Sequence, residues 1–319
     1  MKVEVERCRE FDLFCYKTFM LVYCGIEDIS KDIGKVDATK YREIRALLFA
    51  KPYLSEVNKM TKTLNCIESI EHDVIFFQET NKLLVQELEK EASKFHVIKK
   101  QGVDSVILVS KRLVGQAIDF AKQNQEFLLK YSVALKAHGK EHSSIEEIEK
   151  RLNFNNDSIF QAFGDYLLLN IHLSSKKEKN PQQIKEFIHE FSSILEAIPE
   201  AHLICGGDFN GNISVDLFNE ICKVANTVNI APSGKNTLSV KKKRTMMQPQ
   251  RHKANKLDEA TKDYLLSTMP MLRHEIIFIN GKVISKDLDI PLTPSVDHPY
   301  DHFMILAELQ KPKEKMVQS

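Results

Sequence analysis

The chain has 319 residues, with 45 basic and 44 acidic side chains and a formal net charge of +1. Apolar residues make up 43% and charged residues 28%, which fits a globular protein and excludes a disordered chain. Because the net charge is close to zero, bulk charge does not imply general affinity for nucleic acid, and any phosphate-binding surface must be local.

The composition also bears on the compartment. No run of about eighteen apolar residues occurs, so no transmembrane helix is expected, and the charged N-terminus lacks the apolar core of a signal peptide. Six cysteines without a CxxC pair argue against zinc fingers and redox motifs, and we expect reduced, mostly buried thiols. The chain is therefore expected to be intracellular, either cytoplasmic or nuclear.

Short apolar segments, several of them bounded by Gly, Asp or Asn, predict buried strands. In chain order they are 18–23, 73–77, 105–109, 166–173, 202–205, 274–279 and 302–309. Apolar residues at three- and four-residue spacing predict helices over 41–54, 56–70 and 181–198, the last with Pro181 at its first position. Alternation of strands and helices favours an α/β fold.

Three segments stand apart from the predicted main domain, 17–309, which follows an N-terminal extension at 1–16. Residues 112–160 are polar, lysine-rich and helical in pattern, with a capping box expected from Ser143 to Glu146, and they indicate an insertion. Residues 233–262 are polar and basic and predict a long loop. The tail, 310–319, is expected to be disordered.

The most informative segment is HLICGGDFNGN, in which Asp208 and Asn210 follow an apolar strand and two glycines. Glycines permit a tight strand exit with the backbone close to a ligand. Side chains two residues apart point the same way on extended backbone, so Asp208 and Asn210 are expected to face one phosphate. The alternative for so short a motif is an ordinary polar turn.

A second acidic candidate is Glu79, which follows Gln78 and the apolar segment 73–77. Ligand sites in α/β sheets lie at the carboxyl ends of strands. A carboxylate there suits a hard divalent cation such as Mg²⁺. A solvated loop glutamate is the alternative.

Two histidines lie in or beside apolar strands. His172 shares one face of the predicted strand 166–173 with Asn170, and His302 follows Asp301 at the start of the last strand. A histidine held by a carboxylate can transfer a proton or stabilise charge that develops on a phosphate. The alternatives are a core histidine in the first case and a surface turn in the second.

Taken in chain order, these motifs resemble the endonuclease/exonuclease/phosphatase family, to which deoxyribonuclease I belongs. QE at 78–79, N-x-H-L at 170–173, G-D-F-N at 207–210 and D-H at 301–302 carry the resemblance, which covers residues 17–309. The segment KDYLLS, with Asp263, resembles the family's D-Y-hydrophobic strand. The resemblance implies a four-layer α/β sandwich with two packed mixed β-sheets flanked by helices.

The resemblance further implies a divalent-metal-dependent phosphodiesterase with Mg²⁺ or Mn²⁺ as cofactor. The implied catalytic residues are His172, Asp208, Asn210, Asp263 and His302, and the implied metal ligands are Glu79 and Asp301. We expect Glu79, Asp208 and His302 to converge in one cleft, because each lies at or just beyond the end of a predicted strand.

The family pattern also assigns roles. By resemblance, Asp208 activates or positions the attacking water and Asn210 contacts the phosphate. His172 assists the leaving group, and His302, held by Asp263, contacts the scissile phosphate. Positioning and charge neutralisation carry most of such in-line phosphoryl chemistry.

The run Lys241 to Lys256 is rich in Lys and Arg, and the corresponding loop of the family often reaches the substrate. Lys243, Arg244 and Gln248 are therefore candidates for binding nucleic acid, a phosphorylated small molecule or a lipid headgroup. A solvated loop or a protein-docking segment is the alternative. The helical insertion is a candidate surface for protein partners.

The sequence departs from the family pattern at two places. Cys24 stands where the family has an Asn beside the metal, and a neutral thiol is a poor ligand for Mg²⁺. Tyr300 replaces a small residue before Asp301. These departures leave an alternative open, a catalytically weakened relative that serves as a structural or binding subunit of a larger assembly.

Overall fold

The structure is a computed structural model. It describes residues 56–90, 93–139, 144–153, 158–176, 179–211, 228–231, 239–243, 257–277, 279, 300 and 302–310. The predicted strand 18–23, the predicted helix 41–54, Cys24, Arg244, Gln248 and Asp301 lie outside the described residues. So do the N-terminal extension and nearly all of the tail.

The chain divides into two compact units. The smaller comprises residues 1–59, 240–259 and 290–301, and the larger comprises 60–239, 260–289 and 302–319. In the smaller unit the hydroxyl of Tyr300 donates to the carbonyl oxygen of Lys59 at 3.2 Å, and the Lys59 ammonium lies 5.6 Å from the ring centroid. The large residue before Asp301 therefore has structural contacts of its own.

The segment 233–262, predicted to be one long loop, contains two strands. These are β8, Val240–Lys243, and β9, Leu257–Ala260, which form a two-stranded sheet. The prediction was wrong here because a short two-stranded sheet is held by backbone hydrogen bonds and needs no long apolar run.

Six helices are present in the described residues. They are α4 (Glu56–Ser69), α5 (Lys82–Lys90), α6 (Lys111–Val114), α7 (Phe120–Ala137), α8 (Ile145–Leu152) and α9 (Asn180–Ala197). α4 and α9 confirm two predicted helices, and α9 carries its proline in the first turn. Among the described helices, none is long and apolar enough to cross a membrane.

The described strands of the larger unit form three sheets. Their bounds are β1 (Val74–Phe77), β2 (Phe95–Lys99), β3 (Val106–Ser110), β4 (Ile159–Phe163), β5 (Tyr166–His172), β6 (His202–Asp208), β7 (Asn229–Ala231), β10 (Asp263–Ser267), β11 (Met271–Ile277) and β12 (Met304–Leu309). The sheet β4-β5-β6-β10-β7 is mixed, with β5 and β6 parallel. The described sheet β1-β3-β2 is antiparallel throughout, whereas two mixed sheets were expected, and β11 pairs with β12.

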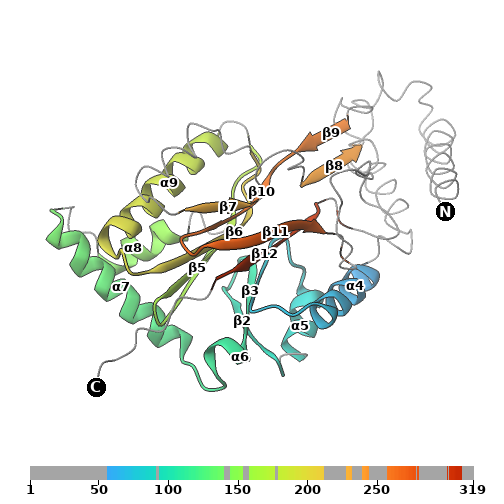
Figure 1. Ribbon diagram of the computed structural model, residues 1–319, viewed down its shortest axis with the longest axis horizontal. Coiled ribbons are helices and arrows are strands. Elements are labelled where there is room, and N and C mark those ends of the chain that lie inside the picture. The colour runs from blue at the N-terminus through green and yellow to red at the C-terminus, as the bar shows by residue number, and fades with distance from the viewer. Residues whose placement is uncertain are drawn as a thin grey trace, which may run out of the picture. The chain divides into compact units, whose positions relative to one another are not determined.

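The larger unit is a four-layer α/β sandwich, as predicted (Figure 1). Side chains alternate across each strand, so Leu167 and Leu169 of β5 pack with α7, α8 and α9, while Leu168 packs with β3 of the other sheet. In β3, Ile107 faces the five-stranded sheet and Leu108 packs against α4 and α5. Both central strands are buried on two faces, which explains their continuous apolar sequences.

The helices of segment 112–160 are joined to α9 by polar contacts to the buried carboxylate of Glu190. The hydroxyl of Tyr131 on α7 donates to Glu190 of α9 at 3.0 Å, and Arg151 of α8 lies 3.3 Å from the same carboxylate. The capping box of α8 runs from Ser144 to Glu147, one residue later than predicted. Two adjacent serines followed by two adjacent glutamates fit both registers in the sequence.

The two glycines before Asp208 are required by close packing. A Cβ on Gly206 would lie 2.6 Å from the Phe76 ring of β1, so this glycine lets the two sheets approach. A Cβ on Gly207 would lie 1.9 Å from the carbonyl oxygen of Ile171, and Gly207 has φ +143°. This glycine brings β5 and β6 together where both strands end.

We predict that Gly207→Ala lowers the free energy of unfolding by about 3 kcal/mol or more, because backbone strain and a steric clash add. Gly164→Ala is the matched control, since Gly164 has φ +53° and a methyl group added there would meet no atom within 4 Å. It should lower stability by only about 1–2 kcal/mol. Urea denaturation of both variants measures the difference, and equal losses would show that the clash at Gly207 is relieved.

Candidate active site

Three neighbouring strands of the five-stranded sheet each carry a candidate residue at the same edge of the sheet. His172 ends β5, Asp208 ends β6, and Asp263 begins the antiparallel strand β10. The strand register pairs His172 with Asp208 and Asp208 with Asp263. Residues from three separate motifs therefore lie on one edge of one sheet.

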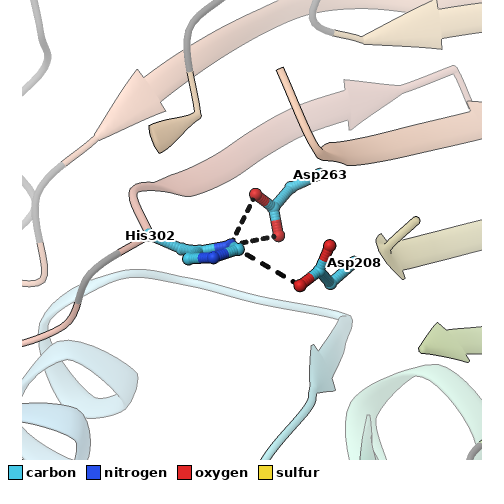
Figure 2. A group of neighbouring side chains, drawn as sticks. All are labelled: Asp208, Asp263 and His302. Carbon is cyan, nitrogen blue, oxygen red and sulfur yellow. Dashed lines mark hydrogen bonds and ion pairs between the residues drawn. The ribbon is translucent and has the colours of Figure 1, made fainter. Parts of the chain in front are cut away.

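His302 reaches the same edge from the segment that precedes β12, and it pairs with Asp263 (Figure 2). Its Nδ1 lies 2.9 Å and 3.1 Å from the two carboxylate oxygens of Asp263. The same nitrogen lies 3.8 Å from a carboxylate oxygen of Asp208. Hydrogen bonding through Nδ1 fixes the orientation of the ring.

Asp208 is a buried carboxyl group with 7% of its surface exposed. Burial and, after it, the negative charge of Asp263 raise the pKa of Asp208 to about 6, against the opposing effects of His302, the Asn210 N–H and His172. A carboxylate with a pKa near neutrality can accept a proton more effectively than an ordinary surface aspartate. The position and chemistry of Asp208 suit a general base.

His172 lies between two carboxylates. Its Nε2 is 3.9 Å from Glu79 Oε1, and its Nδ1 is 3.8 Å from Asp104 Oδ1. The Nδ1 atom is buried and has no hydrogen-bond partner within the described residues. His172 therefore lies between Glu79 and Asp208, its partner in the strand register. Asp208 in turn lies 3.8 Å from His302.

Glu79 is placed by contacts of the two residues that precede it. The side chain of Asn170, fully buried in β5, donates to the carbonyl oxygens of Phe77 and Val106 at 2.8 and 3.0 Å and accepts from Gln78. Glu79 itself has φ +53°, an uncommon conformation for a residue with a side chain, and its carboxylate is exposed. Asn170 therefore joins the two sheets beside Glu79.

Asn210 differs from its expected geometry. β6 ends at Asp208, and Asn210 has φ +51°, so residues 208–210 do not continue as the extended backbone that we predicted. The Asn210 N–H donates to Asp208 at 2.6 Å, and its side-chain amide donates to the Leu173 carbonyl at 2.8 Å. Asparagine tolerates this conformation, and the turn holds the Asp208 carboxylate in place.

The donor groups at this edge meet the needs of a divalent cation only in part. Asp208, Asp263 and His302 offer ligand atoms within 4.8 Å of one another. However, His302 Nδ1 is hydrogen-bonded to Asp263, and Mg²⁺ prefers oxygen ligands, so the arrangement fits an oriented histidine better than three metal ligands. The exposed carboxylate of Glu79 is the more suitable oxygen donor for a cation.

The remaining candidates lie elsewhere or outside the described residues. Lys243 is in β8 of the smaller unit, and its side chain is not among those described. Asp301 also falls outside them. The sequence analysis did not identify Asp104, because nothing marks it in the sequence except its position just before the predicted strand 105–109. It also assigned no role to Gln78.

No family model matches the sequence, and no curated protein matches it. The chain is similar to truncated TDP2 from Caenorhabditis elegans, with 19% identity, 80% of this chain and 93% of that chain covered, and a TM-score of 0.49. It is also similar to TDP2 from D. rerio, complexed with single-strand DNA product, with 14% identity, 80% of this chain and 93% of that chain covered, and a TM-score of 0.47. The similarity to an endonuclease/exonuclease/phosphatase family protein from Leptotrichia buccalis has 14% identity, with 80% of this chain and 95% of that chain covered, and a TM-score of 0.43. Each similarity is one of fold.

Proposed function

We propose that this chain is a divalent-metal-dependent phosphodiesterase, with its reaction centre at the edge formed by His172, Asp208, Asp263 and His302. The observation that carries the proposal is the Asp263–His302 hydrogen bond at 2.9 Å beside the buried Asp208, whose pKa is raised to about 6. A proton acceptor and an oriented histidine side by side are what hydrolysis of a phosphate ester requires.

In the proposed reaction Asp208 accepts a proton from the attacking water. The new P–O bond forms as the bond to the leaving oxygen breaks, and His172 supplies a proton to that oxygen. His302, oriented by Asp263, donates a hydrogen bond to the phosphate oxygen on which charge develops. Asn210 holds Asp208, and the second N–H of its side-chain amide is the proposed donor to the phosphate.

The proposed cofactor is Mg²⁺ or Mn²⁺, held by Glu79 and, from the sequence resemblance, Asp301. When bound, such an ion neutralises charge on the phosphate and on the leaving oxygen. The fit is supported by the exposed carboxylate of Glu79, an oxygen donor that lies 3.9 Å from His172.

Nucleic acid is the proposed substrate class. The basic run from Lys241 to Lys256 supports a polyanion over a small neutral ester. Within this run Lys243, Arg244 and Gln248 are the proposed contacts to the substrate backbone. A phosphorylated small molecule or lipid headgroup would use the same reaction centre without needing the whole run.

We predict that the purified chain hydrolyses phosphodiester bonds in the presence of Mg²⁺ or Mn²⁺ and that excess EDTA abolishes this hydrolysis, because the ion supplies charge that the protein lacks. The assay uses labelled single-stranded DNA, RNA and bis(p-nitrophenyl) phosphate. Adding metal back in excess should restore the rate.

His302→Asn, purified in parallel, controls for a contaminating nuclease. Equal hydrolysis by the wild type in EDTA would exclude the metal-dependent mechanism. If the wild type cleaves none of these substrates, nor phosphoinositides, with any divalent metal, the chain is the binding subunit that the departures from the family pattern left open.

A further inference from the structure

Ser239 lies just before β8 in the chain and is the last residue of the first segment of the larger unit, 60–239, and no role was expected for it from the sequence. We propose that Ser239 is a positioning residue that fixes the backbone on both sides of the Asp263–His302 pair. The kinetic part of this inference rests on the proposed function.

Ser239 makes four hydrogen bonds to backbone groups, and the residue is fully buried. Its hydroxyl oxygen accepts the N–H groups of Lys262 and Asp263 at 2.9 and 3.1 Å. Its carbonyl oxygen accepts the Phe303 N–H at 2.7 Å, and its own N–H donates to Ala260 at 3.1 Å. A single buried serine thus bonds to Asp263 and to the residue that follows His302.

The geometry of the pair depends on these two backbone positions. Asp263 begins β10, and His302 lies outside β12, so neither residue sits in the interior of a strand. The 2.9 Å hydrogen bond between them requires the two backbones to be held at a fixed separation. Ser239 provides a direct connection, with its hydroxyl on the Asp263 side and its carbonyl on the His302 side.

The alternative is that Ser239 is only a buried structural serine. Ser267 allows the two to be separated, because it is also fully buried and its hydroxyl oxygen accepts the Met269 N–H at 2.9 Å. It lies at the other end of β10 from Asp263. Ser267→Ala therefore removes a buried hydroxyl from the same strand without touching the pair.

The first test is spectroscopic and needs no activity. Protein labelled with ¹⁵N at histidine is compared as wild type, Ser239→Ala and Ser267→Ala at one fixed pH, with the His302 signals assigned by His302→Asn. We expect Ser239→Ala to move the ring ¹⁵N and Nδ1 proton signals of His302, because the Asp263 carboxylate shifts. Ser267→Ala should leave them in place.

The second test is kinetic. Ser239→Ala is expected to lower kcat about tenfold, the effect of losing roughly one net hydrogen bond at the pair, with KM within about twofold of wild type. Ser267→Ala should leave kcat within about twofold. Thermal melts of both variants show whether their stabilities match.

If Ser239→Ala does not fold, Ser239→Cys keeps the size of the side chain with a much weaker acceptor and takes its place. Unchanged His302 signals in the folded variant, or equal changes in both serine variants, would overturn the positioning role. If the wild type hydrolyses nothing with any metal, the proposed function fails, and the His302 spectra alone decide the role of Ser239.

Discussion

Asp208→Asn is expected to lower kcat for phosphodiester hydrolysis about a hundredfold or more, because an amide cannot accept the proton of the attacking water. The substitution keeps the shape of the side chain, and its oxygen can still accept the Asn210 N–H that is now 2.6 Å from Asp208. The loss should therefore appear in kcat at saturating substrate and metal, rather than in KM. Steady-state kinetics with labelled single-stranded DNA and with bis(p-nitrophenyl) phosphate measure it.

The same substitution should stabilise the metal-free protein near pH 8. The pKa of Asp208 is raised to about 6 from a reference value of 3.8, mainly by burial and then by Asp263. A raised carboxyl pKa means that folding favours the protonated form, so the contribution of this group is most favourable below pH 4 and is lost as pH rises through about 6. The difference corresponds to about 3 kcal/mol.

Measuring the free energy of unfolding in EDTA at pH 5 and pH 8 tests whether Asp208→Asn stabilises the protein. Asp208→Asn should be more stable than wild type at pH 8, with a smaller gain at pH 5. Asp165→Asn, in the exposed turn between β4 and β5, is the control and should change neither kcat nor stability. A variant that loses activity and stability together at pH 8 would show that Asp208 is structural.

The strands and helices that were predicted correctly are those whose burial gives a continuous apolar run or a clear apolar stripe in the sequence. β3, β5 and β6 are covered on both faces, and α9 has a clear apolar stripe. β2 was missed because its exposure varies along FHVIK and it contains polar residues. β4 was missed because the predicted helical segment ended inside it, at 160, and because its buried Gln161 looks polar in sequence but is satisfied by Asn124 and by backbone carbonyls.

For Asp208, Asp263 and His302 the sequence predicted that the residues lie together, but it did not predict the local geometry around them. The order of the motifs was enough to expect Asp208, Asp263 and His302 together, and the register of β6 with β10 accounts for the first two. No local pattern indicates that Asn210 leaves the extended conformation. The contacts of Asp104 and Ser239 depend on residues far away in the chain, which a single sequence does not pair.

Asp263→Asn and His302→Gln are each expected to lower kcat about 10²–10³-fold, and the double variant should be no worse than His302→Gln alone. The physical reason is that Asp263 acts on the phosphate only through the ring that it orients, with Nδ1 held at 2.9 and 3.1 Å. Once His302 is gone, the only effect left to this carboxylate is that of its charge on the pKa of Asp208. Losses that multiply in the double variant would show that the two residues act independently.

The same variants also distinguish an oriented histidine from a metal ligand. Asp208, Asp263 and His302 are close enough to bind one ion, and loss of a ligand would raise the metal concentration needed for half-maximal rate. An oriented histidine predicts the opposite pattern, in which that midpoint stays within about twofold while kcat at saturating metal falls. Titration of Mn²⁺ into wild type, Asp263→Asn and His302→Gln measures both quantities. A midpoint that rises at least tenfold, with kcat recovered at high metal, would place the ion between these residues instead of at Glu79.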